Sequence, residues 1–376
     1  MRLLYILERP IQNDLPYQLI AKEKNIAITV LCIVQTNGQL AQNENINQSV
    51  FTDYLLYTFP YQFLSNNNSL FNHIKQTDVI VIYGHFHPVF RQAILFAKFF
   101  RKKLILTSDA SSLQGLSGSS GWKLKLKPAL FRLLYNQISE AVFVPSNASK
   151  KFFQQIGIKQ HKIILTPYTV NEEFIQNALQ NSDVAMLKES LGIHINDTVF
   201  MFCGKLIQRK RALDLLYAFS KIKNIASKVI IVGDGPLRLA LEALATDLNI
   251  RHQVIFTGLV PYNELPSHYA LASVLVIPAE HEPYGLPVNE AMICGTPVIT
   301  SNAVGAAGDL IEEGFTGYIY PVADIEALSA KMKLFIDSPE LKKTLANNCQ
   351  QKMKSWNSQS NVAAQLNFFK SKGWLL

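Results

Sequence analysis

The sequence has few cysteines and no long apolar run. The four cysteines in 376 residues are scattered, at Cys32, Cys203, Cys294 and Cys349, so they indicate neither a metal-ligand pair nor a disulfide framework. No stretch approaches the roughly 20 apolar residues of a membrane-spanning helix. In the opening MRLLYILERP only five apolar residues stand between Arg2 and Glu8, which is too short for a signal-peptide core. We therefore expect a cytoplasmic protein.

Acidic residues are nearly absent from one part of the chain. Between Val79 and Ser139 there are nine Lys or Arg residues and one acid, Asp109, although the whole chain has a formal net charge of only +8. In WKLKLKPALFRLLYNQ, Lys123, Lys125 and Lys127 alternate with apolar residues, as is typical of segments that bind an anionic membrane surface. A solvated basic face beside a core helix fits the pattern equally well. No nucleic-acid motif accompanies the charge, so nucleic acid is not an expected partner.

The apolar content is high enough for packed cores, since 48% of the residues are hydrophobic and 17% are charged. Short runs rich in Val, Ile and Leu alternate with helical patterns from RLLYIL to KIILTP, and again from DTVFMFCGKL to GYIYPV. This alternation indicates parallel sheets covered on both faces. We expect two Rossmann-like, doubly wound α/β domains, residues 1–175 and 190–355, with a ligand cleft between them. A helix in residues 356–376 is expected to pack back on the first domain.

Lysines and glycines follow two of the expected strands in the second series. In MFCGKLIQRKRALDLLYAF a strand ends at Gly204 and a helix begins near Arg211, and Lys205 and Lys210 flank this junction. A helix start favours phosphate, and two ammonium groups there would stabilise a departing diphosphate. Ordinary surface lysines are the alternative. In IIVGDGPLR, Gly233 follows the next strand and allows close ligand approach, although a plain strand–helix turn has the same pattern.

The strongest pattern is EHEPYGLPVNEAMICGTPVIT, in which Glu282 and Glu290 flank a tight turn. We expect the backbone of Tyr284, Gly285 and Leu286 to approach a phosphate, because the turn leads into a helix. One acid would bond sugar hydroxyls and the other a ribose diol. A salt bridge or a helix cap is the alternative for either acid.

These motifs resemble the retaining glycosyltransferases of the GT-B fold, sequence family 4 (glycosyl transferases group 1). The resemblance is most specific over residues 198–332, in CGKLIQRKRALDLL, VGDGP, FTGLVPYNELPSHYALASVLVIPAEHEPYGLPVNEAMICGTPVITS and GAAGDLIEEGFTGYIYPVADIEALSAKM. It implies transfer of a sugar from a nucleotide diphosphate sugar with retention, without a cofactor and without a required metal. Residues 190–355 would bind the nucleotide sugar and residues 1–175 the acceptor. The acceptor would be a lipid-linked glycan or a glycolipid, in surface polysaccharide or glycolipid synthesis at the inner face of the cell membrane.

Carried over by position, the resemblance implies roles for individual residues. Lys210 would bind the phosphates, Glu282 the donor sugar and Glu290 the ribose, while Gly204 and Gly233 would belong to the donor site. The candidate catalytic residues are Glu282, Lys205, Lys210 and Asp109.

Three departures from the family pattern leave alternatives open. Lys205 stands where the family usually has Arg, which keeps the charge but loses the bidentate fork. Asp109 stands where many relatives have a His near the reacting sugar, and it would either accept from a sugar hydroxyl or cap a turn. The loop ERPIQNDLPY after the first strand lacks the usual glycines. A non-catalytic partner that binds a nucleotide sugar, or another activity of this fold such as an epimerase, is therefore an alternative.

YGHFHPVF places His85 and His87 after a strand of the first series. They would line the cleft as hydrogen-bonding groups or have a structural role. Two histidines without a third ligand do not indicate a metal site.

Overall fold

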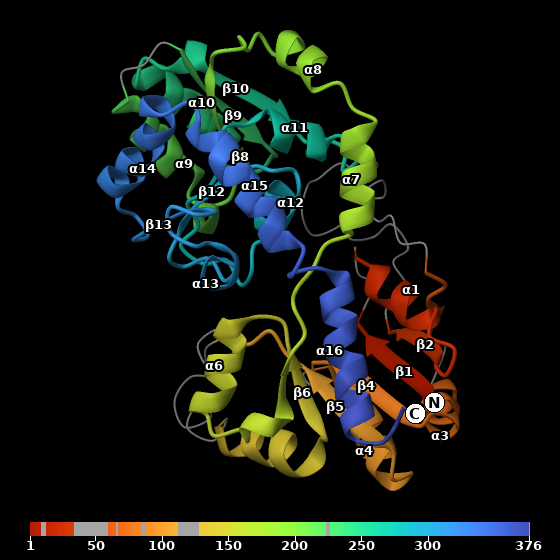
Figure 1. Ribbon diagram of the computed structural model, residues 1–376. Helices are drawn as coiled ribbons and strands as arrows, with labels where there is room; N and C mark the ends of the chain where they lie inside the picture. Colours follow the sequence, from red (N-terminus) through yellow and green to blue (C-terminus); the bar gives the residue numbers. More distant parts are fainter. Residues whose placement is uncertain are drawn as a thin grey trace. The chain divides into compact units, whose positions relative to one another are not determined.

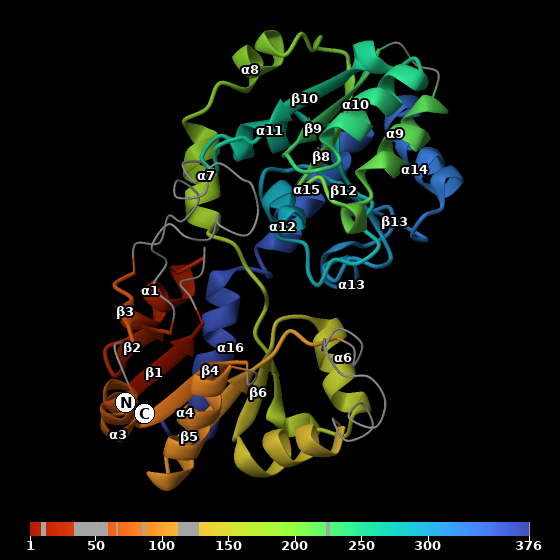
Figure 2. The same cartoon turned by 180° about the vertical axis from the view of Figure 1, so that it is seen from behind.

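The computed structural model describes residues 1–8, 13–33, 59–64, 67–84, 87–111, 128–222 and 226–375. The chain divides into two compact units (Figures 1 and 2). Unit 1 consists of Met1–Asn171 and Asn357–Leu376, and unit 2 consists of Glu172–Trp356. Each unit contains one parallel sheet with helices packed on it, so the predicted class of two parallel-sheet α/β domains is confirmed.

The sheet of unit 1 has the strand order β3-β2-β1-β4-β5-β6-β7. The strands are β1 (Arg2–Leu7), β2 (Ala27–Cys32), β3 (Gln62–Phe63), β4 (Val79–Tyr83), β5 (Lys103–Thr107), β6 (Ala141–Val144) and β7 (Ile163–Leu165). All of their pairings are parallel, and β1 lies between β2 and β4. The strands are buried because their Val, Ile and Leu side chains pack on both faces of the sheet.

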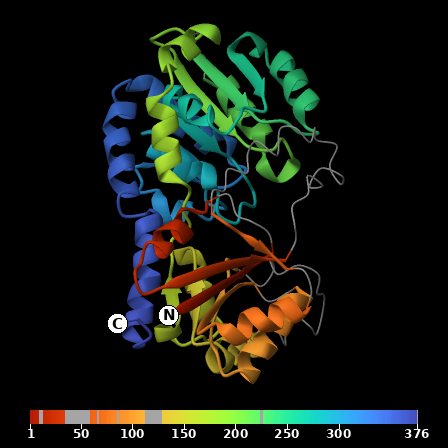
Figure 3. The ribbon, with the colours of Figure 1, turned by 90° about the vertical axis from the view of Figure 1, so that its right-hand side faces the viewer.

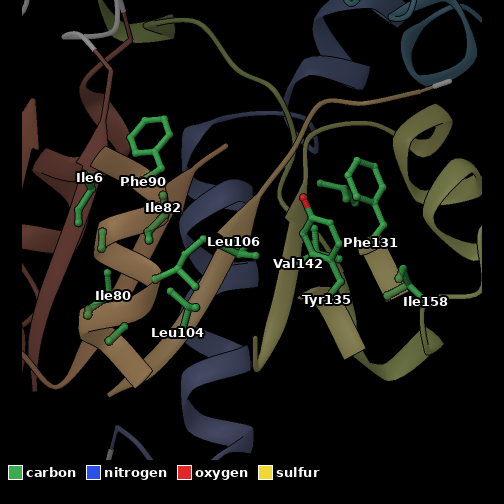
Figure 4. Close-up of a cluster of buried hydrophobic side chains, with 14 of the residues drawn as sticks. Ile6, Ile80, Ile82, Phe90, Leu104, Leu106, Phe131, Tyr135, Val142 and Ile158 are labelled. Carbon is green, nitrogen blue, oxygen red and sulfur yellow. The ribbon is translucent and has the colours of Figure 1, made fainter. Parts of the chain in front are cut away.

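Two sets of helices cover the faces of this sheet. One face carries α3 (Asn67–Gln76), α4 (Pro88–Phe99), a helix over residues 128–132 that continues into the π-helix Leu133–Ile138, and α6 (Asn147–Gln155). Figure 4 shows part of the apolar cluster beneath them, in which Phe90 and Phe131 pack over strand residues such as Leu106. The opposite face carries α1 (Leu15–Ala21) and the C-terminal helix α16 (Ser358–Ser371), which contact each other (Figure 3).

The sheet of unit 2 has the strand order β10-β9-β8-β11-β12-β13. The strands are β8 (Thr198–Cys203), β9 (Ser227–Val232), β10 (Val254–Gly258), β11 (Val274–Ile277), β12 (Val298–Ser301) and β13 (Gly317–Tyr320). The helices are α7 (Glu172–Gln180), α8 (Val184–Ser190), α9 (Ala212–Ser220), α10 (Arg238–Asp247), α11 (Leu265–Leu271), α12 (Leu286–Ile293), α13 (Ala307–Leu310), α14 (Ile325–Asp337) and α15 (Leu341–Met353). Because all the strands are parallel, the loops after β8, β9 and β11 leave the sheet on the same side, at the carboxyl ends of the strands. Ligands of such sheets bind there.

Between the two series of strands, the chain folds into α7 and α8. Asp183 caps α8 by accepting from the N–H groups of Ala185 and Met186, at 3.0 and 2.9 Å. Phe174 of α7 stacks on Tyr262 with ring centroids 5.3 Å apart, and both helices contact α11. These helices therefore belong to unit 2 and extend its core. None of the helices in the described part of the chain is long and apolar enough to cross a bilayer.

Candidate functional site

Gly204 and Gly233 stand at the carboxyl ends of the neighbouring strands β8 and β9. Their φ angles are 153° and 128°, values that favour glycine. A Cβ atom on Gly233 would lie 2.0 Å from the carbonyl oxygen of Gly204, and one on Gly235 would lie 2.7 Å from that of Leu206. The glycines of VGDGP therefore allow the turn after β9 to approach the backbone of the turn after β8 closely.

The structure brings together two of the predicted site residues, Lys210 and Glu282. Lys210 ends the short 3₁₀-helix Gln208–Lys210, and its Nζ pairs with Oε2 of Glu282 in the loop after β11. Their side chains are only 15% and 13% exposed. Arg209 adds a second cation, because its Nη1 lies 3.4 Å from the same oxygen and 2.9 Å from the carbonyl oxygen of His281. The salt bridge that the sequence left as an alternative thus forms at Glu282, and it joins the segment after β8 to the loop after β11.

The turn between the two acids is held by neighbouring backbone. Gly285 has φ 100° and forms the N-cap of α12, so the positive end of this helix dipole lies at the turn. The N–H groups of Gly305 and Ala306 donate to the carbonyl oxygens of Glu282 and Tyr284, at 2.9 and 2.8 Å. The buried Tyr284 hydroxyl also accepts from Nε1 of Trp356 at 2.8 Å. The turn that leads into Leu286 is therefore held both by backbone hydrogen bonds and by a side-chain hydrogen bond.

Glu290, on α12, is 6% exposed. The hydroxyl of Tyr269 on α11 donates to its Oε2 at 2.7 Å, and Tyr262 forms a further hydrogen bond to the carboxylate. The hydroxyl oxygen of Tyr269 also lies 3.3 Å from Sγ of Cys203, at the end of β8. Burial raises the pKa of Glu290, whereas the two tyrosine hydrogen bonds act to lower it. The sequence did not predict either tyrosine, because the spacing within VPYNELPSHYALA carries no signal for a partner on another helix.

The remaining predicted residues are distributed over both units. Lys205 is exposed and follows Gly204 at the end of β8. In unit 1, Asp109 is exposed and follows β5, and its carbonyl oxygen accepts from Oγ of Ser149 at 3.1 Å. His87 caps α4, because its Nδ1 accepts from the N–H group of Val89 at 3.2 Å, which gives it a structural role. His85, Lys123, Lys125 and Lys127 lie outside the described residues.

Comparison with known proteins identifies the part of the chain that carries this geometry. Residues 183–352 match the family Glycosyl transferases group 1. A relative in Methanocaldococcus jannaschii, described as the uncharacterized glycosyltransferase MJ1607, is 36% identical over 36% of this chain and 35% of its own length. The GDP-mannose-dependent alpha-(1-6)-phosphatidylinositol monomannoside mannosyltransferase of Mycolicibacterium smegmatis is 26% identical over 58% of this chain and 59% of its own length. The match thus spans about a third to three fifths of these curated relatives.

Solved structures resemble the whole chain. Crystal structures of Anabaena Alr3699/HepE with UDP and with UDP-glucose have TM-scores of 0.76 and 0.70. Both are 18% identical in sequence and cover 99% of this chain and all of that one, so the likeness is one of fold. Residues 183–352 are therefore similar to the Glycosyl transferases group 1 family, and they lie within a chain that has the two-domain α/β fold known as GT-B.

Proposed function

We propose that the protein transfers a sugar from a nucleotide diphosphate sugar to a hydroxyl of a glycan or lipid-linked acceptor. The observation that carries this proposal is the ion pair between Lys210 and Glu282. It lies at the carboxyl ends of the unit 2 strands, beside the helix that carries Glu290. The relatives support it by their names, since the mycobacterial enzyme is GDP-mannose-dependent and Alr3699/HepE was crystallised with UDP and UDP-glucose.

Each group in this arrangement has a chemical role toward such a donor. The diphosphate would meet Lys205, Lys210 and the amino end of α12, which together stabilise the negative charge that grows on the leaving phosphate. Lys210 would then share its charge between Glu282 and the phosphate. Glu282 would accept hydrogen bonds from hydroxyls of the donor sugar, and Glu290 from those of the ribose.

The same proposal includes retention of the anomeric configuration. The acceptor oxygen would form its bond to C1 of the sugar on the face from which the diphosphate leaves. The breaking C1–O bond gives its electron pair to the phosphate oxygen, and that oxygen takes the acceptor's proton. No cofactor is needed for this balance, and we propose that the lysines and loop amides make a metal unnecessary. Asp109 of unit 1 would accept from a sugar hydroxyl.

We also propose that the protein binds peripherally to the inner face of the cell membrane. Two helices on one face of the unit 1 sheet present exposed apolar side chains. On α4 these are Leu95 and Phe99, which are 68% and 76% exposed, and on the helix over residues 128–138 they are Leu130 and Leu133, which are 58% and 52% exposed. Arg91, Lys98 and Arg132 are exposed on the same helices. Apolar groups that enter a bilayer interface beside cations that meet lipid phosphates suit an anionic surface.

Vesicle flotation tests the membrane proposal. The wild type should float with vesicles that contain anionic lipid but not with neutral vesicles. Both Lys123→Glu/Lys125→Glu/Lys127→Glu and Leu95→Ser/Phe99→Ser should release it. Leu239→Ser is the control, because Leu239 is 78% exposed but lies in unit 2. A wild-type protein that does not float with anionic vesicles contradicts the proposal.

The activity is tested by binding first and by product analysis second. UDP, GDP or ADP should raise the melting temperature in the presence of EDTA, because a ligand that binds only the folded state stabilises it. The matching nucleotide sugar and an acceptor should then give a product whose anomeric configuration, read by NMR, equals that of the donor. Binding without transfer or donor hydrolysis would indicate a non-catalytic partner. An altered donor sugar in the absence of acceptor would indicate an epimerase.

A further inference from the structure

Arg211 follows Lys210 directly and has an unusual backbone conformation. Its φ and ψ of 52° and 36° are left-handed, a conformation that strains a residue with a side chain. Glycine adopts this conformation without that strain. The backbone conformation at this position therefore favours glycine, and the presence of an arginine must be explained by the contacts of its side chain.

The guanidinium of Arg211 joins two segments of unit 2. Its Nε and Nη2 donate to the two carboxylate oxygens of Asp214, at 2.7 and 3.1 Å. Asp214 is 6% exposed in the first turn of α9, so this bidentate pair anchors the side chain. The remaining nitrogen, Nη1, donates to Oε2 of Glu280 at 3.2 Å, in the loop after β11.

This contact completes a clamp between two short stretches, residues 209–211 and residues 280–282. The carbonyl oxygen of Arg209 accepts from the N–H group of Glu280 at 3.0 Å, and Lys210 pairs with Glu282. The Arg211–Glu280 pair is partly exposed, at 25% and 44%, so it contributes little to the stability of the fold. Its larger consequence is geometric, because it restrains the loop that carries Glu282.

We propose that Arg211 is a positioning residue of the donor site, which holds Glu280 and thereby sets the place of Glu282 relative to Lys210. This inference rests on the proposed function. A misplacement of about 1 Å in a reacting site can lower the rate by on the order of a hundredfold, so a contact of little value to folding can matter to turnover.

Glu280→Ala removes the loop's contact with Arg211 and leaves the Arg211–Asp214 pair intact. It should lower kcat/KM for the nucleotide sugar by about tenfold or more. The Kd of the free nucleoside diphosphate should stay within about twofold, because Glu282 would touch the sugar rather than the phosphates. The melting temperature should stay within about 2 °C. Arg211→Lys, which keeps the charge but lacks the fork, should show the same selective loss.

Glu326→Ala is the matched control. It breaks the exposed pair between Lys221 and Glu326, at 44% and 77% exposure, in the same unit. Its kcat/KM should equal that of the wild type. An unchanged kcat/KM in Glu280→Ala overturns the inference, as does a loss of nucleoside diphosphate affinity and melting temperature together. A wild type that binds no nucleoside diphosphate and transfers no sugar overturns the proposed function, and this inference with it.

Discussion

The hydroxyl of Tyr269 donates a 2.7 Å hydrogen bond to Oε2 of Glu290 in the interior of unit 2. This bond opposes the effect of burial, which raises the pKa of Glu290. Cys203, Cys294 and Tyr262 also lie near the carboxylate and interact with it. The two tyrosine hydroxyls therefore favour the charged form of Glu290 against the effect of burial, and donor affinity should depend on them.

Tyr269→Phe should shift the pH dependence of donor binding toward higher pH. Without this hydrogen bond the pKa of Glu290 rises further, so the carboxylate loses its charge, and its ability to accept from two ribose hydroxyls, at a higher pH. The ratio of variant to wild-type Kd for the nucleotide sugar, measured by calorimetry between about pH 5 and 8, should grow as the pH falls. Tyr217→Phe is the control, because Tyr217 is 43% exposed on α9. A ratio that is constant across this range contradicts the role assigned to Tyr269.

Glu290→Gln should raise stability and weaken donor binding. The folded-state pKa of Glu290 is raised above its ordinary value of 4.5, so folding favours the protonated acid. The resulting cost to stability is absent below the unfolded-state pKa and complete above the folded-state pKa. The variant should therefore melt at a higher temperature than the wild type at neutral pH, and the difference should vanish as the pH falls to about 4.5. Donor affinity should fall about tenfold at neutral pH, since the amide is a poorer acceptor for ribose hydroxyls. A variant that binds donor like the wild type would exclude Glu290 from the donor site.

Lys210→Ala should lower turnover by at least about tenfold, equivalent to about 1.4 kcal/mol of barrier. The expected cause is the loss of a cation beside the leaving diphosphate. Arg209 would still lie 3.4 Å from Glu282 in this variant, so the acid would retain a partner and the fold should persist. Lys331→Ala serves as the control, because Lys331 also forms an ion pair, with Glu313, away from this edge of the sheet. Equal kcat values for a folded Lys210→Ala and the wild type would remove Lys210 from the mechanism.

The sequence predicts the fold class because buried parallel strands leave a clear record of Val, Ile and Leu runs between helical patterns. It also predicts Glu282 and Glu290 as a related pair, because they stand on either side of one turn. The Lys210–Glu282 pair joins residues 72 positions apart, and no local pattern records such a contact. The tyrosines around Glu290 are hidden for the same reason. The capping role of His87 depends on one backbone N–H group, which the sequence does not locate.

Gly233→Ala should destabilise unit 2 by about 2 kcal/mol or more. The added Cβ would lie 2.0 Å from the carbonyl oxygen of Gly204, so the two turns would have to separate. Gly192→Ala is the matched control, because Gly192 also has a positive φ, 65°, but has no atom within 4 Å of an added Cβ. Chemical denaturation of the two variants separates overpacking from backbone strain. Equal losses would show that strain alone accounts for the effect at Gly233.

The hydrogen bond from Trp356 to Tyr284 gives a last prediction, which a double-mutant cycle tests. Trp356 is the final residue of unit 2, and Tyr284 lies in the turn that we propose to meet the donor diphosphate. Trp356→Phe removes the N–H donor, and Tyr284→Phe removes the hydroxyl that accepts from it. Each variant should lose about 1 kcal/mol of unfolding free energy, since each leaves one buried polar group without this partner.

The double variant should lose little more than either single one, which corresponds to a coupling energy of about 1 kcal/mol. All three should bind nucleoside diphosphate more weakly than the wild type, because the bond holds the turn that leads into α12. Additive losses of stability would mean that the two side chains act independently. Unchanged nucleoside diphosphate affinity in all three variants would mean that the contact serves folding alone, and that the turn is held sufficiently by the backbone bonds from Gly305 and Ala306.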